Sequence, residues 1–141
     1  MYPSTASPAD AYTKVGIETG VSGASPHKLI LMLFDGAIMA IGSAARQMQA
    51  NQIAEKGQSI SKAIDIITNG LDASLDMKVE GELGARLSAL YEYMCARLLH
   101  AGIKNDRAAL DEVAGLLAEL RSAWEEIADD PAVLSANNAR R

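Results

Sequence analysis

Several residue types that build catalytic, disulfide-bonded or nucleic-acid-binding proteins are scarce in this chain of 141 residues. Its one cysteine, Cys95, can form neither an intrachain disulfide nor a thiolate metal cluster, and it fits a reducing compartment. The 13 basic residues are outnumbered by 18 acidic ones, and a net charge of −5 repels phosphate backbones. We therefore expect no nucleic-acid partner.

Histidine is also rare, and the common catalytic motifs are missing. A di-iron bundle needs Glu-x-x-His pairs, but Ala24 stands three residues before His27 and Arg97 stands three before His100. The chain has no Gly-rich phosphate loop, no GxSxG and no HExxH. We expect no enzyme, no metal and no cofactor, with His27 in an exposed first turn and His100 near a helix end.

What the chain does have is Ala, Leu, Ile and Met recurring at steps of three or four, the spacing of an amphipathic helix. Four long helices are predicted at 26–50, 53–76, 82–103 and 106–128, with a turn at 78–81. We expect an all-α, antiparallel four-helix bundle with a short N-terminal amphipathic segment. The last three apolar stripes are Ile60, Ile64, Ile67, Leu71 and Leu75; Leu83, Leu87, Leu90, Met94 and Leu98; and Leu110, Val113, Leu117, Leu120, Trp124 and Ile127.

The two ends of the chain differ in composition from the predicted bundle at 26–128. Residues 1–25 are rich in small and polar types, yet Tyr12, Val15 and Ile17 have near-helical spacing. They predict a flexible segment with a lid-like amphipathic stretch. The polar tail at 129–141 is expected to be disordered. The N-terminus lacks the basic and apolar regions of a secretory signal, so we expect the mature chain to start here.

The first predicted helix is more apolar than a bundle requires. Of the 17 residues from Leu29 to Ala45, 13 are apolar and Asp35 is the only charge. A core face needs only Ile30, Leu33, Phe34, Ala37, Ile41 and Ala44. Leu31 and Ile38 then project to one side, and Met32 and Met39 lie nearly opposite the core. Something must cover these four side chains.

Three explanations differ in what covers the extra apolar surface. A membrane span is disfavoured, because the stretch is shorter than the ~20 residues needed and contains Asp35, so no membrane insertion is expected. A second explanation is a central helix touched on several sides by its own chain. The third is an open groove for an amphipathic segment of a partner, a surface to which methionines adapt well. The last two stay open.

The run from Ser25 to Ala37, SPHKLILMLFDGA, resembles the signature of the flagellin-specific export chaperone family (FliS) of bacterial flagellar type III secretion. Blocks within 62–76, 87–94 and 116–124 agree in the same order, so the resemblance covers residues 10–128. The turn near Gly81 departs from it, with a single glycine where relatives often have a pair.

The resemblance implies an antiparallel bundle that binds the C-terminal segment of flagellin in the cytoplasm. It further implies that bound flagellin is kept from premature polymerisation and is presented to the flagellar export gate protein. The family's N-terminal tyrosine falls on Tyr12, in a segment that covers part of the binding surface when flagellin is absent. The partner-binding residues that we expect are Tyr12, Ile17, Leu31, Phe34, Ile38, Ile41, Ile66 and Leu71. The alternatives are an adaptor that homodimerises through the same groove and an enzyme of unrecognised type.

Overall fold

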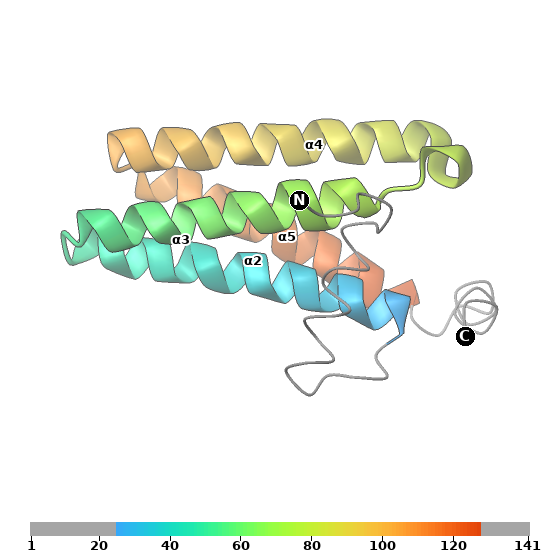
Figure 1. The fold of residues 1–141 in the computed structure, drawn as a ribbon, viewed down its shortest axis with the longest axis horizontal. Helices are drawn as coiled ribbons and strands as arrows, with labels where there is room; N and C mark the ends of the chain where they lie inside the picture. The colour runs from blue at the N-terminus through green and yellow to red at the C-terminus, as the bar shows by residue number, and fades with distance from the viewer. Residues whose placement is uncertain (1–24, 128–141) are drawn as a thin grey trace, which may run out of the picture.

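The computed structural model describes residues 25–127, which form helices joined by short turns, with no β-strand in that range. The elements are α2 (Pro26–Gln49), α3 (Ile53–Asp65), η1 (Ile66–Leu71), η2 (Asp72–Ser74), α4 (Met77–Lys104) and α5 (Arg107–Glu126). Successive long helices run in opposite directions (Figure 1). The predicted all-α antiparallel bundle is confirmed, whereas the predicted N-terminal segment and C-terminal tail lie outside the described residues.

Helix α2 begins where the sequence supplies both an N-cap residue and a proline, whose fixed φ angle suits the first helical position. Ser25 Oγ accepts a hydrogen bond from the Lys28 amide at 3.1 Å, and Pro26 occupies the first turn. After Gln49 the chain turns through Asn51, whose φ of 57° suits asparagine better than most residues. The predicted bounds of this helix are therefore confirmed to within a residue.

The second predicted helix, 53–76, is wrong as a single α-helix. Its α-helical part ends at Asp65, a π-helix (η1) follows, and a short 3₁₀ turn (η2) completes it. The buried residues of η1 are Ile66, Ile67, Gly70 and Leu71. In a π turn each N–H bonds to the carbonyl five residues back, so the turn is wider than in the α-helix that the sequence predicted.

The turn predicted at 78–81 is displaced toward the N-terminus. The chain is already extended at Leu75 and Asp76, and Asp76 Oδ1 accepts a hydrogen bond from the Lys78 amide at 3.0 Å, which starts α4. Gly81 then breaks the helix with φ 55° and ψ −124°, a conformation that favours glycine. Figure 1 shows this first turn standing off from the rest of α4. Leu83 follows the kink and is 61% exposed, so its predicted place on the buried stripe is wrong.

A buried lysine fixes the junction between α4 and α5. Lys56 of α3 is 6% exposed, and its Nζ donates to the Gly102 carbonyl at 3.0 Å and to Asn105 Oδ1. The cation therefore satisfies the carbonyl end of α4, where the helix dipole is negative. Asp106 next caps α5, its Oδ1 accepting from the Ala109 amide at 3.2 Å.

The core lies between the four long helices. Helices α2 and α4 both pack against α3 and α5, so α2 and α4 are diagonal to one another (Figure 1). The largest fully buried side chains are Ile41, Ile67, Met94, Leu98, Leu110, Leu117 and Val113. By length and a mean hydropathy of 1.6, α2 could also cross a membrane, but a core helix of a bundle meets the same criteria.

Candidate partner-binding surface

The eight predicted partner-binding residues fall into three groups. Tyr12 and Ile17 lie outside the described residues. Leu31 and Ile38 are half-buried at the surface of α2. The remaining four belong to the hydrophobic core and are 2 to 7% exposed: Phe34, Ile41, Ile66 and Leu71. These four hold the helices together, while Leu31 and Ile38 remain within reach of a partner.

Leu31 and Ile38 lie on the side of α2 that meets α5, on either side of an ion pair. Asp35 accepts hydrogen bonds from Arg121 Nε at 2.5 Å and from Arg121 Nη2 at 3.4 Å. This contact raises the pKa of Arg121, whose Nη1 also donates to Glu125 at 3.1 Å. The only charge in the apolar stretch of α2 is thus paired. We call Leu31, Asp35, Ile38 and Arg121 the α2–α5 surface.

The opposite flank of α2 carries the methionines and a shallow depression against α3. Met39 is 71% exposed and Met32 is half-buried. The depression has a volume of about 230 Å³ and is lined by Gly36, Met39, Ala40, Ser43, Gln47, Ser59 and Lys62. A Cβ on Gly36 would lie 3.4 Å from Ile66 Cδ1, so this glycine permits close packing of η1. Four of these seven lining residues carry polar side chains, so the depression offers polar as well as apolar contacts.

The expectation that His27 is exposed is wrong. Its ring is stacked on Trp124 with centroids 4.6 Å apart and planes 9° apart, and the residue is 6% exposed. Trp124 Nε1 donates to the His27 carbonyl at 2.9 Å. Burial lowers the pKa of His27, and neither ring nitrogen has a hydrogen-bond partner among the described residues. His27 stands seven residues before Phe34, two helical turns along the same face, and this spacing was the available signal.

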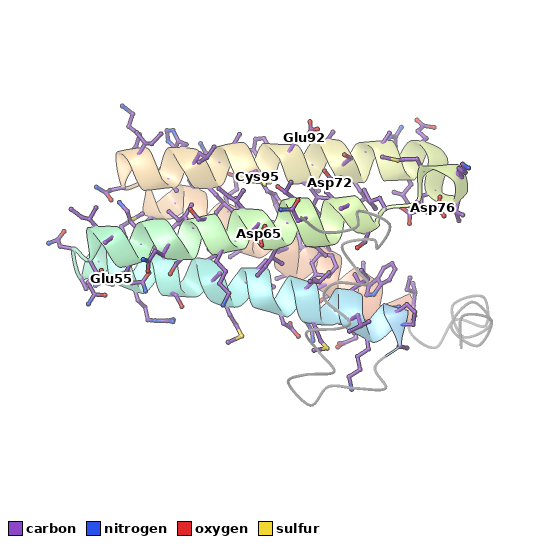
Figure 2. All side chains as sticks on the ribbon, viewed as in Figure 1. Glu55, Asp65, Asp72, Asp76, Glu92 and Cys95 are labelled. Atoms are coloured by element: carbon purple, nitrogen blue, oxygen red, sulfur yellow. The ribbon has the colours of Figure 1, made fainter. Side chains whose placement is uncertain are left out.

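Cys95 lies where α4 meets η1, as Figure 2 shows. The thiol is half-buried and its Sγ lies 3.4 Å from Thr68 Oγ1. Burial raises the pKa of Cys95, and the negative charges of Asp72 and Glu92 raise it further. The residue packs against the hydrophobic core as a half-buried thiol. No three histidine, cysteine or acidic residues within 25–127 are grouped to hold a metal ion.

Comparison with known proteins identifies the family to which this chain belongs. The family model described as flagellar protein FliS matches residues 8–131. The chain belongs to the FliS family. The flagellar secretion chaperone FliS of Salmonella typhimurium is 48% identical over 123 residues, which are 87% of this chain and 91% of that protein. The FliS of Escherichia coli is 44% identical over 124 residues, 88% of this chain and 91% of its own length.

A third FliS relative, the flagellar secretion chaperone FliSB of Pseudomonas aeruginosa, is 47% identical over 116 residues, 82% of this chain and 91% of that protein. The resemblance inferred from Ser25–Ala37 is therefore confirmed. Membership of the FliS family makes this chain a member of a group of flagellar secretion chaperones.

Proposed function

We propose that this FliS-family chain binds the C-terminal segment of flagellin in the cytoplasm, keeps it from polymerising and delivers it to the flagellar export gate. Membership of a family of flagellar secretion chaperones is the observation that carries the proposal. Flagellin's terminal segments bury apolar helix faces in the filament, so before export those faces need a temporary partner. An apolar surface on a folded bundle supplies one.

The α2–α5 surface suits an amphipathic client helix. Leu31 and Ile38 are seven residues apart on α2, which is two helical turns or about 10 Å. A client with apolar side chains at the same spacing can contact both. Because Asp35 is already paired with Arg121, a client helix crossing this surface leaves no unpaired charge behind. The cost of ordering the client limits affinity, which allows later release.

The proposal assigns different roles to the other predicted residues. Phe34, Ile41, Ile66 and Leu71 lie in the core, so we assign them to supporting the surface rather than to contacting the client. We propose that Tyr12 and Ile17 cover part of the α2–α5 surface when flagellin is absent, as the family resemblance implies. The client then competes with a segment of the same chain.

Titration calorimetry of the full chain with a peptide of the flagellin C-terminal segment tests the function, with light scattering to give stoichiometry. We expect a one-to-one complex, and an affinity loss of at least about tenfold in the double variant Leu31→Ala, Ile38→Ala. Val79→Ala is the matched control, because Val79 is 81% exposed at the far start of α4. Circular dichroism confirms that each variant is folded. A constitutive dimer that ignores the peptide would support the adaptor function instead.

A further inference from the structure

His27 is buried at the start of α2 in a place that suits neither of its protonation states. The residue is 6% exposed, and its ring is stacked on Trp124 with centroids 4.6 Å apart. Both Nδ1 and Nε2 are buried without a hydrogen-bond partner among the described residues. A neutral imidazole has one N–H and one acceptor nitrogen, whereas a protonated imidazole has two N–H groups and a charge. Burial without partners therefore penalises the charged form far more than the neutral one.

The charges of α2 and α5 near His27 do not offset this penalty. On α2, Lys28 is exposed and has the same sign as an imidazolium, and the carboxylate of Asp35 is held by Arg121. On α5, Arg121 Nη1 also donates to Glu125 at 3.1 Å. Glu126 is exposed and lies about 200° around the helix from the stacked tryptophan. No carboxylate of these two helices is therefore placed beside the ring.

The remaining elements on this side of the bundle supply no counter-ion either. The π turn η1, which packs against α2, contains no charged side chain. Asp72 of η2 lies near Cys95 of α4, and Asp65 of α3 accepts a hydrogen bond from Asn69 at 2.6 Å. Lys62 of α3 lines the depression on the other flank of α2, and the other charges of α3 lie in its first turn, at the opposite end of the bundle (Figure 1).

Two sets of effects act on a protonated His27 in opposite directions. The face of the indole ring attracts a cation, which favours the imidazolium. Against this, the charge loses its water, two N–H groups lack acceptors, and the positive end of the α2 dipole lies at the same turn. Burial lowers the pKa of His27, so the second set dominates. The ring takes up a proton most readily after it leaves the stack.

The stack belongs to the same contact between helices as the proposed client surface. His27, Leu31 and Asp35 are spaced four residues apart along one side of α2. On α5, Arg121 lies one turn before Trp124, whose Nε1 also donates to the His27 carbonyl at 2.9 Å. Figure 1 shows the start of α2 beside the end of α5. When the ring leaves, the turn that leads to Leu31 loses the stacking contact that holds it against α5.

We propose that the His27–Trp124 stack is an acid-sensitive latch on the α2–α5 surface. A proton taken up by His27 drives its ring out of the stack, loosens the first turn of α2 and lowers the affinity of the surface for its client. The regulation of client binding rests on the proposed function, whereas the opening of the latch is a property of the chain alone. Because such coupling is reciprocal, a bound client holds His27 in its neutral form.

Tryptophan fluorescence tests the latch without any client, because Trp124 is the only tryptophan in the chain. The full chain is titrated from about pH 8 to about pH 5, and circular dichroism confirms that it stays folded. We expect a reversible change in emission with a midpoint below about pH 6.5. The change should be absent in His27→Phe and retained in His100→Gln, the matched control at the other histidine. His27→Leu takes the place of His27→Phe should the latter not fold.

The titration has two outcomes that would overturn the proposal: no change in emission of the unmodified chain, or the same change in His27→Phe. Hydrogen exchange then shows whether the ring leaves the stack. After correction for the intrinsic exchange rate, amides of residues 29–33 should lose protection at about pH 5.5 relative to about pH 7.5, while those of residues 41–45 should not. Unchanged protection at 29–33 would mean that a protonated ring stays stacked, and the latch would be refuted.

Titration calorimetry with the flagellin C-terminal peptide connects the latch to the client. We expect the affinity to be about three- to tenfold lower at about pH 5.5 than at about pH 7.5, since one proton contributes at most about tenfold per pH unit. His27→Phe should lose this difference, and bound peptide should move the fluorescence midpoint of the unmodified chain to lower pH.

The calorimetry separates failure of the latch from failure of the proposed function. An equal pH dependence of affinity in the unmodified chain and in His27→Phe would refute the regulation, while the proposed function stands. A peptide that does not bind at about pH 7.5 would refute the proposed function and the regulation with it, and the fluorescence titration would still decide whether the latch opens.

Discussion

Removing the Trp124 side chain should loosen the end of the bundle where α2 begins and α5 ends. Trp124 is the only tryptophan in the chain, its ring covers His27, and its Nε1 donates to the His27 carbonyl at 2.9 Å. A fully buried tryptophan truncated to alanine costs about 3–5 kcal/mol. Trp124 is half-buried, so the burial contribution is about half of that, or about 2 kcal/mol.

The lost hydrogen bond adds about 1 kcal/mol, and Trp124→Ala should therefore lower the free energy of unfolding by about 3 kcal/mol. Trp124→Phe keeps an aromatic ring over His27 and loses only the N–H donor, so about 1 kcal/mol is expected. Ser122→Ala is the control at an exposed position of the same helix, with a change within about 0.5 kcal/mol.

Urea unfolding of the four proteins should be followed by far-UV circular dichroism, because the two Trp124 variants lack the tryptophan fluorophore. A loss under about 1 kcal/mol for Trp124→Ala would refute the reasoning, since it would mean that the stacked ring and its hydrogen bond do not stabilise the fold. Equal losses for the alanine and phenylalanine variants would show that the ring contributes nothing beyond its hydrogen bond.

Three further predictions concern other described residues. Burial lowers the pKa of His27, so the unfolded chain binds a proton at this residue more readily than the folded chain does. The free energy of unfolding should therefore fall as the pH drops below about 6.5, by at most about 1.4 kcal/mol per pH unit. Urea unfolding at several pH values should show a weaker pH dependence for His27→Phe. Lys56→Ala leaves the carbonyl end of α4 without its buried cation and should cost about 2–3 kcal/mol by chemical denaturation, whereas the exposed Lys62→Ala should be nearly neutral. Gly81→Ala forces a positive φ on alanine and should cost about 1 kcal/mol or more, whereas Gly57→Ala, in a helix with nothing within 4 Å, should stabilise by about 0.5–1 kcal/mol in the same assay.

Features determined by local spacing were predictable from the sequence. Ser25 and Asp106 cap the starts of α2 and α5, and Pro26 occupies the first turn of α2. These residue types favour those positions wherever they occur, so the sequence alone predicts both helix starts. The apolar stripes likewise predicted which faces meet in the core. Leu83 and Ile127 are the exceptions, because one follows the kink at Gly81 and the other lies beyond the last residue of α5.

Features that depend on contacts between distant segments were not predictable. Both flanks of α2 carry apolar side chains, and which flank is covered depends on where α5 packs. The ion pair that marks this contact joins Asp35 to Arg121, 86 residues away. Nothing in the local sequence marks Lys56 as buried, since its partners are the Gly102 carbonyl, 46 residues away, and the Asn105 side chain. The π turn at Ile66–Leu71 likewise has no signal in the apolar spacing, which suits an α-helix equally well.

Choosing between surface and core for the eight predicted binding residues also needed the structure. Phe34 and Ile41 share a helix with Leu31 and Ile38, and apolarity alone does not separate them. Their positions around α2 do so once the neighbours α3 and α5 are known, because these cover one side of the helix fully and the other only in part.

Photo-cross-linking tests the central claim most directly, because it reports which surface the client occupies. A photoreactive phenylalanine analogue is placed at Leu31 in one protein and at Val79 in another, and each is irradiated with the flagellin C-terminal peptide. The account predicts an adduct from position 31 that excess unlabelled peptide abolishes, with none from position 79. The absence of an adduct at position 31, or equal adducts at both positions, would contradict it.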